Sequence, residues 1–245
     1  MQEVLLFVAV GFLAQVVDGA LGMAYGLMAS SILLAMGVAP ATASASVHAA
    51  EMFTTGASGL AHWRAGNVIP RLMWKLAVPG ALGGVLGAYV LTDWPVEIMR
   101  PLVSAYLLVM GVLILRRALG PPAAPPPQPP RVAVLGFGGG FLDAVGGGGW
   151  GPLVTSTLIG RGNVPRTAIG STNAAEFFVT TAITAVFVAT IGLELWPVIL
   201  GLVLGGVLAA PLAALITRRV PARPLMVIVG VVISLLALRG LFAAL

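Results

Sequence analysis

The sequence predicts an all-α polytopic membrane protein built from two inverted repeats. Three observations lead to this prediction: the composition, long apolar runs, and an internal repeat. Of the 245 residues, 59% are hydrophobic and 9% are charged, whereas a soluble domain has about a quarter charged residues. The runs 76–91, 102–115 and 196–216 approach or reach the ~20 residues of a helical membrane span. These runs do not alternate in the way that membrane barrel strands do, so helices are expected.

The charge balance fits a membrane protein better than a nucleic-acid-binding one. The formal net charge is +5, and basic residues in a membrane protein report its orientation. We therefore expect the lipid bilayer, and no nucleic acid, as a partner. The chain has no cysteine, which excludes disulfides and thiolate metal sites.

The internal repeat divides the chain into two halves. Residues 11–56 align without a gap on 136–181, with an offset of 125 residues, and 17 of the 46 positions are identical. The identical pairs include Asp18/Asp143, Gly22/Gly147, Pro40/Pro165, Ser46/Ser171 and Glu51/Glu176. We expect one transmembrane repeat at 1–118 and a second at 132–245. The proline-rich segment 119–131 between them has the composition of a semi-rigid linker.

Each half is predicted to start with a broken or re-entrant helix hairpin that three transmembrane helices follow. The hairpin segments are too short to span a bilayer singly, and each pair flanks a glycine-rich break at 18–26 or 143–151. The expected hairpin segments are 4–17 and 27–36, then 132–142 and 152–160. The expected long helices are 42–61, 72–91 and 98–116, then 167–190, 196–216 and 224–242.

The basic residues favour a hairpin over a single broken crossing. With a hairpin in each half, 11 of the 13 Lys and Arg residues fall on one side, and only Arg100 and Arg239 fall on the other. With a single crossing, Arg161 and Arg166 change sides and the split becomes 9 to 4. The positive-inside rule therefore predicts inverted repeats, with both termini on the outer side of the cytoplasmic membrane.

The stretch "DAVGGGGWGP" at 143–152 admits two interpretations. Consecutive glycines break a helix and let the backbone approach a ligand, and broken helices form the substrate sites of secondary transporters. Small residues also let membrane helices pack closely. We favour a substrate-lining break, and packing alone stays the alternative.

Four acids fall within the predicted membrane segments, where an ionisable side chain is a functional candidate. They are the repeat-related pairs Asp18/Asp143 and Glu51/Glu176. The two aspartates directly precede the breaks, and capping is the favoured role for them. Each glutamate belongs to a polar helix stripe, His48–Glu51–Thr55 or Asn173–Glu176–Thr180, and could carry protons or serve as scaffold. No metal site is expected, because Asn173 stands at the second-repeat position of His48.

The segments "GFLAQVVDGALGMAYG" and "DAVGGGGWGPLVTSTLIGRGNVPRTAIGSTNAAEFFVT" resemble the sulfite exporter TauE/SafE family of membrane transporters. The resemblance covers the whole chain and implies export of a small sulfur-containing anion, such as sulfite or the organosulfonate sulfoacetate. The candidate substrate site that it implies comprises Gly147, Gly148, Gly149, Trp150, Ser171, Asn173 and Glu176, with the first-repeat partners Gly22, Tyr25, Ser46, His48 and Glu51.

The expected function is therefore that of a secondary transporter, with proton coupling through Glu51 or Glu176 as an open question. Arg161 and Arg166 are expected to gather anions at the cytoplasmic mouth. A passive anion channel with the same fold is the alternative. An intramembrane enzyme is disfavoured, because the sequence lacks a cysteine, a His-x-x-x-His and a Gly-x-Ser-x-Gly motif. No cofactor is expected, and assembly into a homo-oligomer is left open.

Overall fold

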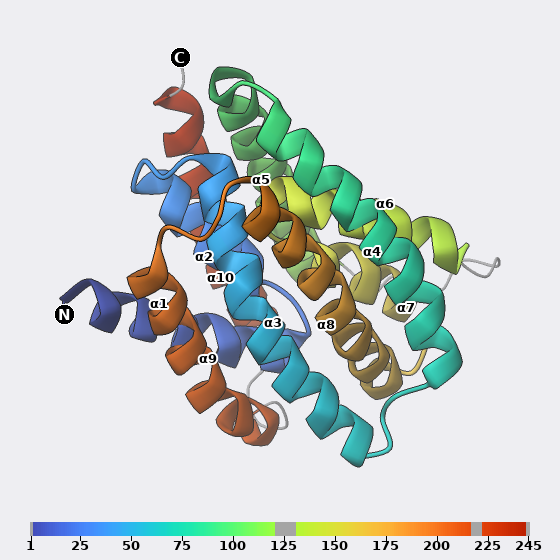
Figure 1. The fold of residues 1–245 in the computed structure, drawn as a ribbon. Helices are drawn as coiled ribbons and strands as arrows, with labels where there is room; N and C mark the ends of the chain where they lie inside the picture. Colours follow the sequence, from blue (N-terminus) through green and yellow to red (C-terminus); the bar gives the residue numbers. More distant parts are fainter. Residues whose placement is uncertain (1, 121–130, 217–221, 244–245) are drawn as a thin grey trace.

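The computed structural model describes residues 2–120, 131–216 and 222–243, and all regular secondary structure in these ranges is helical. The predicted all-α fold is therefore confirmed (Figure 1). Most of the predicted linker, residues 121–130, and Arg218 and Arg219 lie outside the described residues. The first half contains α1 (Gln2–Leu21), α2 (Tyr25–Ala35), α3 (Pro40–Arg64), α4 (Pro70–Asp93) and α5 (Val96–Leu119). The second half contains α6 (Val132–Gly146), the π-helical turn η1 (Gly151–Thr155), α7 (Ser156–Gly160), α8 (Pro165–Thr190), α9 (Trp196–Ile216) and α10 (Ala222–Phe242).

Prolines set the starts of three long helices. Pro40, Pro70 and Pro165 each occupy the first turn of α3, α4 and α8. Proline suits this position because the first N–H groups of a helix have no intrahelical acceptor and its fixed φ is already helical. The Pro40/Pro165 identity of the repeat therefore marks the start of the same helix in both halves.

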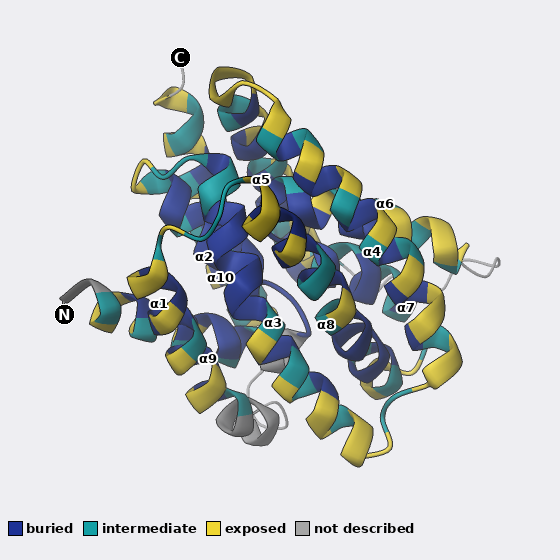
Figure 2. Ribbon diagram, in the orientation of Figure 1, coloured by how far each residue is buried: buried dark blue, intermediate teal, exposed yellow. Residues whose placement is uncertain are grey.

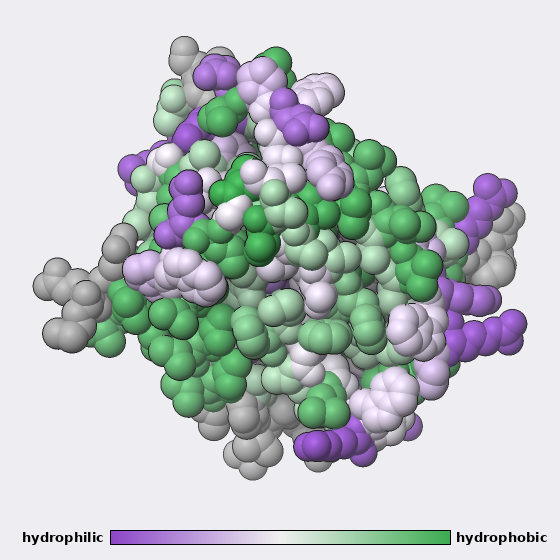
Figure 3. All heavy atoms as spheres, in the orientation of Figure 1, coloured by the Kyte–Doolittle hydropathy of each residue, from purple (hydrophilic) through white to green (hydrophobic). Residues whose placement is uncertain are grey.

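The surface is that of a membrane protein. Within the described residues, four helices are long and apolar enough to cross a membrane, namely those at 70–93, 96–119, 165–190 and 223–242. Large hydrophobic side chains such as Leu82 (62% exposed) and Leu208 (63% exposed) point outward, and hydrophobic residues cover most of the face shown in Figure 3. Exposure of such a large apolar surface to water is unfavourable, whereas the apolar tails of lipids can cover it. The buried residues lie on the inner faces of the helices (Figure 2).

The two halves pack on each other in a reciprocal way. Helix α1 packs against α9 of the other half, and α6, its repeat counterpart, packs against α4. Helices α3 and α8 lie side by side, and α5 packs against α10 (Figure 1). Gly11 lies against the backbone of Leu202, and its counterpart Gly136 lies against the backbone of Leu76. This exchange of equivalent contacts is the arrangement expected of a pseudo-two-fold repeat.

Contacts along the helices show where each hairpin opens. Gly201 faces Val4 and Phe7, while Gly205 faces Val8 and Phe12, so α1 and α9 run parallel and start at the same end. The Arg100 guanidinium donates to the Gly37 carbonyl at 3.1 Å, which places the end of α2 beside the start of α5.

Helix α6 likewise runs parallel to α4, because Gly83 faces Phe137 and Gly87 faces Phe141. At that end, the Ile69 N–H donates to Ser171 Oγ near the start of α8, at 2.9 Å. The first hairpin therefore opens at the end of α4, where α5 starts, and the second hairpin opens at the start of α4. These are opposite ends of the bundle. The inversion of the repeats across a membrane stays a prediction.

Candidate functional site

The second break is a run of left-handed and extended glycine backbone that ends α6. Gly147 has φ +67°, Gly148 +143° and Gly149 +145°. Residues other than glycine adopt such backbone angles only with strain. In the first repeat, Gly22 has φ +66° and Ala24 has φ +99°. Gly22 matches its repeat counterpart Gly147 in φ, and Ala24, the counterpart of Gly149, is the one described residue other than glycine with a positive φ. The first break therefore keeps only part of the backbone form of the second.

The two breaks cross each other in the middle of the bundle. A Cβ on Gly26 would stand 2.8 Å from Gly148 Cα and 3.0 Å from the Gly147 carbonyl oxygen. A Cβ on Gly151 would stand 2.5 Å from the Gly22 carbonyl oxygen. Backbone cannot move aside as a side chain does, so glycine is required where the breaks meet. In this conformation the glycine run is therefore packed against the backbone of the other repeat.

Asp143 holds the second break in place. Its carboxylate Oδ1 accepts a hydrogen bond from the Trp150 N–H at 2.9 Å, and its carbonyl accepts from the Gly148 N–H at 2.9 Å. The side chain therefore caps the helical segment after the break, as N-cap acids do. Asp18 directs its carboxyl to the Tyr25 N–H in the first repeat.

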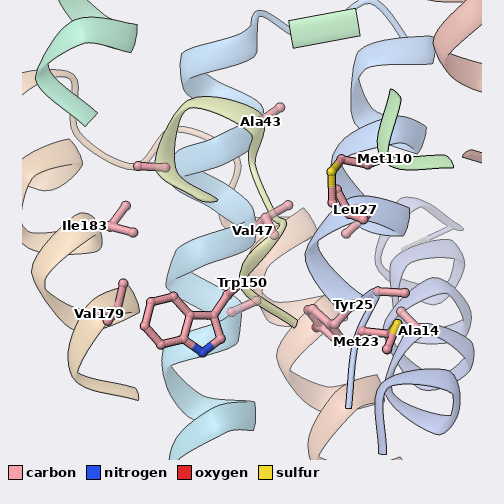
Figure 4. Close-up of a cluster of buried hydrophobic side chains, with 14 of the residues drawn as sticks. Ala14, Met23, Tyr25, Leu27, Ala43, Val47, Met110, Trp150, Val179 and Ile183 are labelled. Carbon is pink, nitrogen blue, oxygen red and sulfur yellow. The ribbon is translucent and has the colours of Figure 1, made fainter. Parts of the chain in front are cut away.

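The paired aromatic residues Tyr25 and Trp150 anchor the breaks to neighbouring helices. The fully buried Trp150 donates its indole N–H to the Thr172 carbonyl at 3.2 Å, and its ring lies beside Val179 (Figure 4). The Tyr25 hydroxyl donates to the Leu202 carbonyl at 2.9 Å. Both polar groups are bonded within the protein in this conformation.

A small polar cavity lies between the repeats and is rich in carboxyl groups. Its lining includes one residue of α2 and residues of α1, α3 and α8, namely Gln15, Asp18, Tyr25, Glu51, Thr54, Thr55, Ser58 and Glu176. Its volume is about 10 Å³, counted as the space open to the centre of a water molecule. This is room for about one water molecule. The cavity is therefore too small for an anion of the size of sulfite in this conformation, and binding requires it to widen.

A second buried cluster adjoins the cavity at Glu51. One ligand atom from each of His48, Glu51 and Asp143 lies within 4.8 Å of the others. His48 Nε2 is 3.3 Å from Asp143 Oδ2, and Glu51 Oε2 has no hydrogen-bond partner. Within the described residues the group has three members, whereas a closed structural zinc site has four ligands.

Two comparisons place this architecture among known proteins. The model of the family described as "Sulfite exporter TauE/SafE" matches residues 7–240. The chain belongs to the TauE/SafE sulfite exporter family. It is 40% identical to the "Probable membrane transporter protein YtnM" of Bacillus subtilis (strain 168) over 250 residues, which cover 98% of this chain and 83% of the relative. No solved structure matches the chain.

Membership of the TauE/SafE family makes this chain a multi-pass membrane transporter of a small anion. The family and the name of the relative both indicate transport, not catalysis. The resemblance seen in the two sequence segments is thereby confirmed over almost the whole chain.

The structure brings some of the candidate site residues of this TauE/SafE member together and separates others. Asp18, Tyr25, Glu51 and Glu176 line the cavity. The remaining candidates do not line it: Gly22, Ser46, His48, Asp143, Gly147, Gly148, Gly149, Trp150, Ser171 and Asn173.

Several of these excluded residues are bonded within the protein. Ser171 Oγ accepts from the Ile69 N–H, and Ser46 Oγ donates to the Thr42 carbonyl at 2.8 Å. The Asn173 amide donates to Ser58 Oγ at 2.8 Å, so Asn173 reaches the cavity only through Ser58. Arg161 and Arg166 are exposed near the start of α8.

Sequence reasoning missed several polar residues around the breaks and the cavity. Gln15 lies one turn before Asp18 on α1, and Ser58 lies two turns after Glu51 on α3, so a longer helical stripe would have found both. Ser30 donates to the Gly147 carbonyl, and Tyr106 donates to the Gly148 carbonyl at 3.0 Å. These two contacts join segments more than 40 residues apart, and no local pattern signals them.

Tyr106→Phe is expected to lower the free energy of unfolding by about 1–2 kcal/mol, because the buried Gly148 carbonyl loses its side-chain donor. Thermal unfolding in detergent measures the change. Tyr89, which is 45% exposed, provides a matched control, and Tyr89→Phe should leave the transition in place. Equal effects of the two substitutions would show that the Tyr106 hydrogen bond does not support the break.

Proposed function

We propose that this protein is a secondary transporter that exports a small sulfur-containing anion, sulfite or an organosulfonate such as sulfoacetate, across the cytoplasmic membrane. The proton participates through the carboxyl groups of the central cavity. The observation that carries the proposal is the cavity itself, where Asp18, Glu51 and Glu176 meet between the two repeats. Secondary transporters with inverted repeats bind their substrates at this place, near the midplane and beside broken helices.

The carboxyl groups explain why a proton would take part. An ionised carboxylate repels an anion strongly in a site of low dielectric. An anion can therefore occupy this cavity only when the surrounding carboxyl groups carry protons. Protonated carboxyl groups, together with the hydroxyls of Thr54, Thr55 and Ser58, are hydrogen-bond donors that suit sulfite or sulfonate oxygens.

This linkage predicts that protons leave together with the anion. Sulfite and sulfoacetate are dianions when fully ionised. One such anion that leaves together with one proton therefore still carries one net negative charge across the membrane. The membrane potential, worth about 2.3 kcal/mol per charge for each 100 mV, drives that charge outward. Export thus needs no fixed cation in the site.

Efflux from proteoliposomes tests the proposal. Vesicles are loaded with sulfite or sulfoacetate, and efflux is followed with an acid interior, an acid exterior and no pH gradient. We expect efflux above that of empty liposomes, accelerated by the acid interior. Efflux that follows only the voltage would indicate a passive anion channel, and efflux of neither anion would overturn the substrate assignment.

The proposed orientation places both termini outside and the basic end in the cytoplasm. A reporter that is active only in the cytoplasm should be inactive when it is fused after Leu245. The same reporter inserted in the linker, within residues 121–130, should be active. The reverse pattern would contradict the orientation.

Arg161 and Arg166 are proposed to concentrate the anion at the cytoplasmic mouth. The double substitution to Gln is expected to raise the apparent KM for export several-fold and to leave the maximal rate in place, because exposed charges act on encounter. The effect should fade at high ionic strength. Arg239→Gln, an exposed arginine near the end of α10, is the control, and an equal KM for all variants would remove this role.

A further inference from the structure

A histidine–aspartate contact joins the two repeats beside the polar cavity, outside its lining. His48 belongs to α3 of the first repeat, and Asp143 belongs to the last turn of α6. Both side chains are buried, and Nε2 lies 3.3 Å from Oδ2. It is the one ion-pair contact among the described residues. Its hydrogen-bond partners determine where the proton of the imidazole resides.

The partners of His48 Nδ1 require a proton on that nitrogen. Nδ1 is 2.8 Å from the Ser44 carbonyl oxygen, which can only accept. Nδ1 is also 3.2 Å from Ser44 Oγ. The single hydroxyl proton of Ser44 is already donated to the Ala144 carbonyl at 2.7 Å. Nδ1 is therefore the donor in both contacts.

This assignment leaves two acceptors facing each other unless another proton is present. A neutral imidazole with Nδ1–H presents a lone pair at Nε2, and an ionised carboxylate only accepts. A contact of 3.3 Å between two bare acceptors in a buried site is unfavourable. One additional proton on either Nε2 or Oδ2 converts the contact into a hydrogen bond.

The other titratable groups around the pair are acids and phenols. The titratable groups that interact with Asp143 through its charge are Glu51 on the same helix as His48, Tyr106 on α5 and Glu176 on α8. Asp18 on α1 and Tyr25 on α2 line the cavity together with Glu51. In the described part of the chain, no Lys or Arg is hydrogen-bonded to any of them. Glu51 Oε2 is buried without a hydrogen-bond partner beside the pair. A proton on the pair reduces the uncompensated negative charge at this place.

We propose that His48 and Asp143 form a proton-binding site that holds one proton between Nε2 and Oδ2 and fastens α3 to the glycine break of the second repeat. Asp143 Oδ1 accepts from the Trp150 N–H at 2.9 Å, so the same carboxyl group that binds the proton also caps the break. Release of the proton sets two acceptors against each other and loosens this attachment. Glu51, which also lines the cavity, places the site next to the path of the anion.

The site occurs once in the molecule although its fold is repeated. Ile169 and Asn173 occupy the second-repeat positions of Ser44 and His48. Asparagine cannot take up a proton, and the Asn173 amide is bonded to Ser58. One proton-binding pair per chain is therefore expected. The role of the pair in transport rests on the proposed function, whereas its occupancy by a proton does not.

Nuclear magnetic resonance of the full chain in nanodiscs, with ¹³C,¹⁵N-labelled histidine, tests the occupancy. The chain has only two histidines, His48 and His62, so His62→Asn assigns the spectrum. We expect His48 Nδ1 to be protonated and the Nε2 shift to change on Asp143→Asn, which keeps the acceptor for Trp150. A bare Nδ1, or an Nε2 shift that is the same in both proteins, overturns the proposal. A shift that moves when bound metal is removed with EDTA also overturns it, because a cation would then occupy the site.

Transport supplies a second readout that a purely structural role would not move. We compare efflux of sulfite with and without a pH gradient for His48→Asn, which installs the residue of the second repeat, and for Asp143→Asn. The ratio of the two rates is expected to lose its dependence on the gradient in both variants and to keep it in His62→Asn. An unchanged ratio overturns the coupling. If the unmodified protein moves no sulfite, the proposed function fails, and the resonance experiment still decides the proton site.

Discussion

Replacement of Gly148 by alanine is expected to remove most of the folded protein. Gly148 has φ +143°, and a Cβ there would overlap the backbone of Gly26 and Leu27, where the two breaks cross. Strained backbone costs about 1–3 kcal/mol, and overpacking costs about 1–3 kcal/mol or more. Against a typical stability of about 5–15 kcal/mol, the sum should lower both the yield of monodisperse protein and its unfolding temperature. Size-exclusion chromatography and thermal unfolding in detergent measure these quantities.

Gly138→Ala is the matched control for this experiment. Gly138 lies within α6, and a Cβ there meets nothing within 4 Å. Alanine in a helix is favoured over glycine by about 0.5–1 kcal/mol, so this variant should unfold at the same or a slightly higher temperature. Comparable losses in both variants would mean that α6 is sensitive to any added carbon and that the crossing of the breaks is not the cause.

Replacement of Glu51 by glutamine is expected to abolish the dependence of efflux on the pH gradient. Glu51 is the one acid that belongs both to the cavity lining and to the cluster with His48 and Asp143. Glutamine keeps the shape of the side chain and cannot take up or release a proton. Because one pH unit across the membrane is worth about 1.4 kcal/mol, or tenfold, for each proton carried, the up to roughly tenfold acceleration that a gradient of one unit can give should be lost. Proteoliposomes loaded with sulfite measure this rate with and without the gradient.

Two further substitutions define what the Glu51 result means. Glu97 is exposed in the first turn of α5, so Glu97→Gln should retain the unmodified response. Glu176→Gln tests whether the second cavity glutamate shares the role, and a loss in this variant as well would assign the proton to the cavity as a whole. Full gradient dependence in Glu51→Gln would leave Glu51 as scaffold, the alternative that the polar stripe left open.

The helices were predictable because their signals are local. The apolar runs and the glycine-rich breaks predicted the long helices to within a few residues, for example 167–190 against Pro165–Thr190. The turn after the second break is the exception. It begins as the π-helical segment Gly151–Thr155, whereas the matching residues of the first repeat are α-helical. No period in the sequence separates the two forms over so few residues.

The candidate site was predictable only in part. The polar stripe on α3 predicted that Glu51 and Thr55 share a face, because spacing along a helix fixes which side chains do so, and both line the cavity. The sequence could not pair His48 with Asp143, which are 95 residues apart. It also could not show that the Trp150 indole is bonded to the Thr172 carbonyl, or that the glycine run packs on Gly26.

The sequence by itself determined that this protein is a helical membrane protein with two related halves, and it located the breaks and the acids inside the helix bundle. Composition, hydropathy and repetition are sums or periods along the chain, so they can be obtained from the sequence without knowledge of the fold. Only the tertiary structure decided which acids share a cavity, how small that cavity is, and which histidine meets which aspartate. Those properties depend on how helix faces from distant segments meet, and the energy of a buried charge depends on its neighbours in space.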